Sequence, residues 1–235
     1  MNTALNFYRA LASLVVGLLS AWVGTAESVA QGSNPPVYTQ PQNVGDLLAA
    51  IKNSGHDAVA CDQSGRVIKV SLPSKWCNDS NLALVAQLPD LRELVLQGCG
   101  PTPEALRLLR NHTNLCALHF ACCPHLTNGL LSEAATFAQV TELFLWGAEG
   151  TPADYKALAT LTNLVHVRIT DVSSFGDVEL ARFTNLPALK NLVIGSVKLT
   201  ERSAALLPQF RALTNAQLRG YGTGWKTNWH GAAVP

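Results

Sequence analysis

The feature that most constrains this chain is a short leucine motif that returns at a nearly fixed interval. Leu91, Leu94 and Leu96 have the order L-x-x-L-x-L, and the same apolar pattern recurs in seven copies at steps of 24 or 25 residues. The last two apolar positions of the copies are Val70 and Leu72, Leu94 and Leu96, Leu118 and Phe120, Leu143 and Leu145, Val167 and Ile169, Leu192 and Ile194, and Ala216 and Leu218. Apolar and outward residues alternate, which predicts a short strand with one buried side. A fixed interval predicts stacked repeats that bury these side chains against one another.

The second half of each repeat has a different spacing. Three positions before each strand are mostly apolar at steps of three, as in Leu82, Val85 and Leu88. That step predicts a short helix or 3₁₀ segment packed on the strands. Threonines precede these segments and are suitable helix caps: Thr102, Thr127, Thr151 and Thr200. The chain is therefore expected to be α/β, with a parallel sheet on one side and short helices on the other.

These motifs resemble the leucine-rich repeat superfamily over about residues 56 to 220, and Cys61 to Pro73 is similar to the opening of many secreted members. The resemblance implies a curved, horseshoe-like solenoid with a concave parallel sheet and convex helices. The repeats look most like the secreted bacterial type, although Gly98, Gly147 and the Cys122-Cys123 pair replace the usual asparagine after the strand. The resemblance further implies binding of other molecules, most often proteins, on the concave sheet, and it does not imply catalysis.

The first 30 residues have the layout of a signal peptide. Arg9 is followed by a largely apolar run from Ala10 to Gly24, and small residues continue to Ala30. A run of 15 residues is shorter than the ~20 that span a bilayer. We therefore expect cleavage and a secreted, periplasmic or cell-envelope protein, with an uncleaved membrane anchor as the alternative.

The remaining boundaries follow from composition. Residues 31–43 hold prolines and polar residues and predict a flexible linker. Residues 44–66 predict an N-terminal cap, made of a helix over Val44 to Lys52 and a hairpin strand over Ala58 to Cys61. The repeats fill residues 67–220. Residues 221–235, with Trp225 and Trp229, are a C-terminal cap over the last repeat or a tail that docks elsewhere.

Outward strand positions define a candidate ligand-binding face. Phe144 and Trp146 lie on one expected strand, with His119 and Arg168 on its two neighbours. Glu142 and His166 complete the set of candidates. Exposed aromatic side chains beside an arginine are typical of a binding hot spot. The alternative is that loops or the tail cover them.

The six cysteines allow two interpretations. In an exported protein an even number suggests disulfides. Cys99 and Cys123 occupy equivalent places in adjacent repeats, and Cys61 and Cys77 flank the first repeat strand, so these two pairs are the disulfide candidates. The alternative is that most are reduced core thiols. A metal site is not expected, because no second cluster completes Cys122-Cys123 and His125.

The sequence offers little catalytic chemistry. It contains no G-x-S-x-G, H-E-x-x-H or P-loop motif, and no cofactor is expected. A net charge of +1 gives no case for nucleic acid. The favoured function is an exported, non-catalytic module that binds a protein or peptide on the concave sheet. The alternatives are a structural cell-envelope protein and a carbohydrate-binding protein, with Glu93 and Glu142 as the carboxylates that hydrolysis would need. The oligomeric state is left open.

Overall fold

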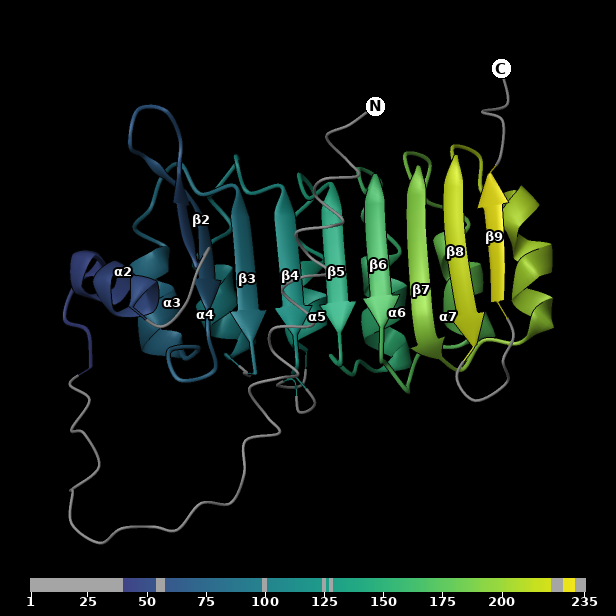
Figure 1. Cartoon of the computed structure of the whole chain (residues 1–235), viewed down its shortest axis with the longest axis horizontal. Helices are drawn as coiled ribbons and strands as arrows, with labels where there is room; N and C mark the ends of the chain where they lie inside the picture. The colour runs from purple at the N-terminus through teal and green to yellow at the C-terminus, as the bar shows by residue number, and fades with distance from the viewer. Residues whose placement is uncertain are drawn as a thin grey trace, which may run out of the picture. The chain divides into compact units, whose positions relative to one another are not determined.

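One continuous sheet organises the protein. The computed structural model describes residues 40–53, 58–98, 101–123, 126, 129–220 and 226–230. Residues 41–235 form a compact unit of their own. The strands lie side by side in chain order, as Figure 1 shows. They are β1 (Val59–Cys61), β2 (Val67–Leu72), β3 (Glu93–Gln97), β4 (Ala117–Ala121), β5 (Glu142–Trp146), β6 (His166–Thr170), β7 (Asn191–Val197), β8 (Asn215–Gly220) and β9 (Lys226–His230).

Strands β2 to β8 carry the repeats and run parallel. Their register places each apolar position opposite its equivalent in the next repeat: Leu94 pairs with Val70 on one side and with Leu118 on the other. The same correspondence continues to β8, where Leu218 pairs with Ile194. The predicted repeat interval and the predicted parallel sheet are therefore confirmed.

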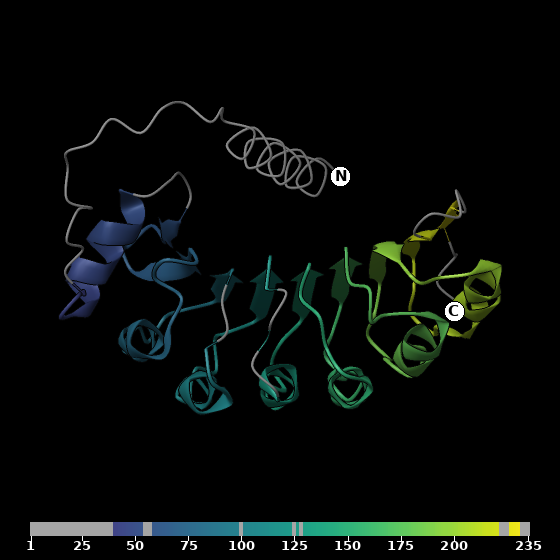
Figure 2. The same ribbon diagram turned by 90° about the horizontal axis from the view of Figure 1, so that it is seen from below.

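The helices of the repeats lie on one side of this sheet, as Figure 2 shows. They are α3 (Asp79–Val85), α4 (Pro103–Arg107), α5 (Leu130–Ala134), α6 (Pro152–Leu158), α7 (Asp177–Phe183) and the 3₁₀ segment η1 (Glu201–Gln209). Thr102, Thr151 and Thr200 cap α4, α6 and η1, because each side chain accepts a hydrogen bond from an N–H of the first turn. Thr127 lies outside the described residues. The alternation of strand and short helix confirms the predicted fold class.

The core is a ladder of buried leucines between the two layers, closed at both ends. Helix α2 (Val44–Lys52) covers the first end with Leu47 and Ile51, which are fully buried. At the other end β9 pairs antiparallel with β8, and Trp229 packs against the core. Trp225 lies outside the described residues.

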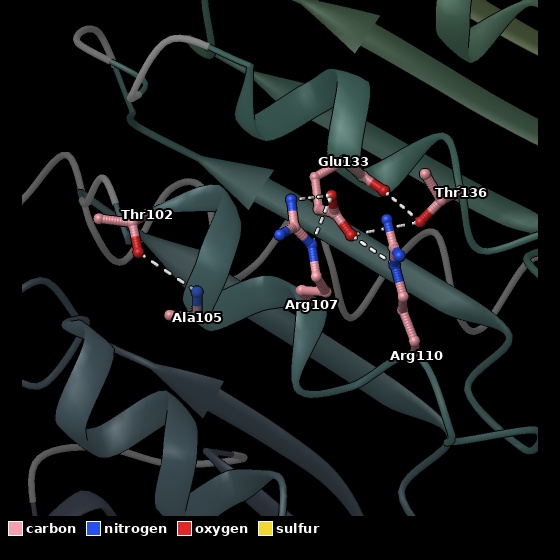
Figure 3. A network of polar contacts seen from close by, with 6 residues as sticks. All are labelled: Thr102, Ala105, Arg107, Arg110, Glu133 and Thr136. Carbon is pink, nitrogen blue, oxygen red and sulfur yellow. Dashed lines mark hydrogen bonds and ion pairs between the residues drawn. The ribbon is translucent and has the colours of Figure 1, made fainter.

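Neighbouring repeats are joined by polar contacts on the helix side. Asp79 at the start of α3 accepts from the backbone N–H and the hydroxyl of Thr102, at 2.8 and 2.9 Å. In Figure 3, Glu133 of α5 holds both Arg107 and Arg110, with N···O distances of 3.2 and 2.7 Å. The Glu133 side chain is 6% exposed, so a buried carboxylate is satisfied by two half-exposed arginines from the preceding repeat.

A column of left-handed residues lies at or near the ends of strands β3 to β7. The turn residues have φ near +55° to +60° in successive repeats: Gly98, Cys122, Gly147, Asp171 and Ser196. At the first four positions the backbone N–H donates to a carbonyl at the end of the next strand, for example from Cys122 to Trp146. The left-handed backbone explains the glycines in this turn, which the sequence shows in place of asparagine.

Cys122→Gly is expected to raise the free energy of unfolding by about 0.5–1 kcal/mol. Glycine removes the steric cost of a Cβ in the left-handed conformation, about 1–2 kcal/mol. Part of this gain is offset because glycine raises the conformational entropy of the unfolded chain. Urea unfolding measures the change. The control is Gly147→Ala in the same column, whose added Cβ meets no atom closer than 3.7 Å. It should lose about 1 kcal/mol, and a loss in both variants would contradict this explanation.

His112 interrupts an otherwise apolar column on the helix side. It occupies the place that Leu88, Phe137 and Leu161 hold in other repeats, and it is 8% exposed. Within the described part of the chain, neither ring nitrogen has a hydrogen-bond partner. A buried polar group without a partner destabilises the folded state.

His112→Leu is therefore expected to raise the free energy of unfolding by about 1–3 kcal/mol. Thermal and urea unfolding of the variant measure the gain. Leu161→His, at the equivalent position two repeats on, serves as the control and should lower stability. An unchanged or lower stability for His112→Leu would show that the ring nitrogens are satisfied in solution.

The two predicted disulfide pairings are wrong. Cys61 is a free, exposed thiol. Cys123 is buried and keeps its thiol, which donates to the carbonyl oxygens of Leu96 and Ala121 at 3.6 and 3.3 Å. Cys77 is nevertheless disulfide-bonded. Cys99 lies outside the described residues.

Candidate functional site

The predicted cluster comes together on the face of the sheet that the repeat helices leave open. Register places His119 opposite Phe144 and Phe144 opposite Arg168, on β4, β5 and β6. Trp146 lies two residues along β5 from Phe144 and therefore points to the same side. All of the predicted binding residues are thus neighbours on three adjacent strands, because equal steps in sequence bring equivalent positions together.

Phe144 is held from both sides. The His119 ring meets it edge-on, with centroids 5.6 Å apart and an interplanar angle of 86°. The guanidinium carbon of Arg168 lies 5.0 Å from the centroid of the Phe144 ring. Edge-to-face and cation–π contacts of this geometry are attractive. The ring and the guanidinium are therefore set in place before any ligand arrives.

Trp146 is fixed by a residue that sequence reasoning did not select. Its indole N–H donates to Oδ2 of Asp171 at 2.8 Å. Asp171 directly follows β6 and belongs to the left-handed column. Its position in the sequence could have identified it, because Asp171 directly follows Thr170, the residue that pairs with Trp146 on the neighbouring strand.

His119 lies beneath this surface and connects two carboxylates. It is 5% exposed, with Nε2 3.2 Å from Oε1 of Glu142 and Nδ1 3.5 Å from Oε1 of Glu93. Glu93 also accepts from Lys69 at 2.8 Å. His119 therefore positions its neighbours and offers little surface to a ligand. The same contacts occupy the gap between Glu93 and Glu142, so the two carboxylates do not face each other across open space as hydrolysis would need.

Glu142 is the charged member of the cluster whose titration is perturbed. Burial raises the pKa of its carboxyl, but the hydrogen bond from His119 and the positive charges of His119, His166 and Lys69 outweigh burial and hold the pKa below its usual value. Because the unfolded chain binds a proton more readily, this carboxylate stabilises the fold above the unfolded value of 4.5 and loses that effect as pH falls through the lower folded pKa.

Glu142→Gln is expected to lower the free energy of unfolding at pH 7 by about 1–2 kcal/mol, since it replaces a charge-assisted hydrogen bond to His119. The difference from wild type should shrink steadily as pH falls below 4.5. Urea unfolding between pH 7 and pH 3 measures it. A difference that stays constant over this range would mean that the Glu142 charge does not stabilise the fold.

His166 is exposed and belongs to a second polar row. Its Nδ1 lies 3.1 Å from Nδ2 of Asn191, Nδ2 of Asn215 donates to Oδ1 of Asn191, and Nδ1 of His230 lies 3.1 Å from Oδ1 of Asn215. An amide nitrogen only donates and an amide oxygen only accepts. His166 therefore accepts through Nδ1, and His230 donates through Nδ1. The row runs in one direction across β6 to β9.

The deciding feature of the fold is the stack of L-x-x-L-x-L strands in register, each followed by a short helix on the same side. This is a leucine-rich repeat solenoid. No protein-family model matches the sequence, and no curated protein matches it.

The comparison with solved structures finds similarities at low identity. Internalin C2 of Listeria monocytogenes has a TM-score of 0.43 and 18% identity, over 82% of this chain and 100% of its own. A second internalin of that bacterium, inlF, has a TM-score of 0.40 and 16% identity, over 59% of this chain and 45% of its own. The ectodomain of the Arabidopsis thaliana receptor kinase GASSHO1/SCHENGEN3, solved with CASPARIAN STRIP INTEGRITY FACTOR 2, has a TM-score of 0.41 and 18% identity, over 77% of this chain and 28% of its own.

Two further observations concern the described residues alone. No three His, Cys, Asp or Glu side chains among them gather in a way that could hold a metal ion. None of the helices in that part of the chain is both long and apolar enough to cross a membrane. The predicted signal peptide, residues 1–30, lies outside the described residues, as does the predicted linker except for residues 40–43.

Proposed function

We propose that this chain is an exported, non-catalytic interaction module that binds a protein or peptide on the concave face of its sheet. The observation that carries the proposal is the fixed cluster of Phe144, Trp146 and Arg168. Each side chain is partly exposed, and each is held by a neighbour: the Phe144 ring by His119 and Arg168, the Trp146 indole by Asp171. Groups already ordered in the unbound protein lose little conformational entropy on binding.

The shape of the face suits a macromolecular partner. Strands lie about 4.8 Å apart, so β2 to β8 present a surface on the order of 30 Å wide. Tryptophan and arginine are enriched among the residues that dominate protein interfaces. Within the described residues, the repeat helices lie on the opposite side of the sheet. An extended peptide or a protein surface can therefore reach the Phe144 and Trp146 rings without displacing a helix.

The proposal of export draws on two parts of the chain. Residues 1–30 have the layout of a signal peptide. The disulfide at Cys77 is a bond that persists in oxidising compartments and is rare in the cytosol. Both support secretion or placement in a periplasm or cell envelope.

Affinity capture with a matched pair of variants tests the function. The bait is the full chain, compared with Phe144→Ala/Trp146→Ala/Arg168→Ala and with Leu108→Ala/Val178→Ala. Leu108 and Val178 are the exposed large apolar residues of the described chain, at 52% and 64%, and lie on the helix side. The partner should be lost with the first variant and kept with the second, at matched melting temperatures. Loss with the second variant alone would move the binding surface to the helices and overturn the proposal.

A further inference from the structure

We propose that the segment recognised by this face is acidic, and that it binds along β6 to β9 through Arg168, Arg219 and Lys226. This inference rests on the proposed function and names the chemistry of the partner. It follows from the uneven distribution of charge along the sheet, from the register of the last four strands, and from a glycine in their surface.

Charge divides the sheet into two halves. In β2 to β5, Lys69 is paired with Glu93, and Glu142 adds a second carboxylate. Strands β6, β7, β8 and β9 contain no Asp or Glu at any position. They carry Arg168, Arg219 and Lys226. Asp171 directly follows β6 and accepts from the Trp146 indole, so one carboxylate stands against these three cations. The concave face therefore keeps an excess of positive charge toward the C-terminal end, although the whole chain has a net charge of only +1. A local excess of this kind attracts a partner of opposite charge.

Register brings two of the cations together. Arg219 of β8 pairs with Lys226 of β9, and both side chains are exposed. Paired positions on neighbouring strands point to the same face. Arg168 lies two strands away on β6, about 9.6 Å from β8 at the usual strand spacing. An extended chain advances about 3.3 Å per residue, so an acidic stretch of about four or five residues covers the distance from Arg168 to Lys226.

The surface between these cations favours a peptide backbone. Gly195 of β7 lies opposite Thr170 and presents no side chain, so another chain can approach the sheet closely there. The exposed side chains of His166, Asn215 and His230 form part of the polar row along the same strands. They supply hydrogen-bonding groups beside the cations. Val193 and Phe144 lie next to Arg168 in the middle row, so an apolar residue should adjoin the acidic stretch.

Fluorescence anisotropy with defined peptides tests the inference. The probes are three labelled decapeptides that differ only in four central residues, Glu, Gln or Lys, followed by a leucine. The Glu peptide should bind the full chain at least about tenfold more tightly than the Gln peptide in dilute salt, and its binding should weaken as salt rises toward about 0.3 M. Equal binding of the Glu and Gln peptides, or no binding of the Glu peptide, would overturn the inference.

Two double variants locate the site. Arg219→Gln/Lys226→Gln should weaken the Glu peptide about fivefold or more. Lys156→Gln/Arg202→Gln removes the same charge from exposed positions on α6 and η1. It should change binding by less than about twofold. Equal losses in the two variants would show a general charge effect and overturn the proposed site.

The outcomes also separate this inference from the proposed function. The partner could be lost with the Phe144/Trp146/Arg168 variant but still captured by Arg219→Gln/Lys226→Gln. That result would support the concave face as the binding surface and overturn the inference that the bound segment is acidic. Binding of heparin without any binding of the Glu peptide would indicate that the cationic strands bind an anionic polysaccharide. It would equally overturn the inference of an acidic peptide.

Discussion

Phe175→Ala is expected to lower the free energy of unfolding by about 3–5 kcal/mol, because it removes a fully buried ring and leaves a cavity. Phe175 meets Tyr155 and Phe183 edge-on, with centroid distances of 5.2 and 5.7 Å. It therefore joins the helix layers of two repeats, α6 and α7. Urea unfolding measures the loss, which corresponds to a fall of roughly 10 °C in Tm for a domain of this size.

The control for Phe175 keeps most of the volume. Phe175→Leu fills much of the cavity but gives up the aromatic contacts, so it should lose clearly less than the alanine variant. Equal and small losses for both variants, within about 1 kcal/mol, would mean that the two repeats do not pack around this ring.

Gly98→Ala is expected to cost about 3 kcal/mol or more, for two separable reasons. Its φ is +60°, where a Cβ costs about 1–2 kcal/mol. In addition, the new Cβ would lie 2.6 Å from the Cβ of Ser74, which is attached directly to the backbone of the preceding repeat. Overpacking of that kind costs a further ~1–3 kcal/mol. Urea unfolding of the variant measures the total.

Ser74→Gly separates the two terms. In the Ser74→Gly background the clash is gone and the left-handed cost stays, so Gly98→Ala should destabilise Ser74→Gly by less than it destabilises the wild type. Full additivity of the two single changes would contradict direct contact between these turns. The comparison with Gly147→Ala, which meets no close atom, gives the left-handed cost by itself.

Much of the fold could be predicted because repeats turn sequence distance into spatial position. Once Leu91, Leu94 and Leu96 define one strand, equal steps fix which residues of the next strand lie opposite, and the observed pairing of Leu94 with Leu118 follows. The juxtaposition of Phe144 with Arg168 is a consequence of the same arithmetic. A repeat array thus lets neighbouring residues on one face of the sheet be named without a structure.

The features that could not be predicted depend on how individual side chains pack and hydrogen-bond within the repeat array. Alternation assigned His119 to the outward row, but its two flanking carboxylates and the Phe144 ring bury it. The hydrogen bond from the Trp146 indole to Asp171 depends on a left-handed turn, which the apolar pattern of the repeats does not predict. Disulfide pairing depends on local backbone direction as well as repeat spacing, and equivalent places do not guarantee facing thiols.

We propose that the partner binds the concave face of the sheet, where the aromatic cluster and the cationic strands lie, and not the helices. Site-specific photo-crosslinking tests this most directly. A benzophenone side chain is placed in turn at Val193 and Gln217 on the concave strands, and at Leu108 and Val178 on the helix side. With the captured partner present, we expect crosslinks from the first two positions and none from the last two. Crosslinks confined to Leu108 and Val178 would contradict binding on the concave face.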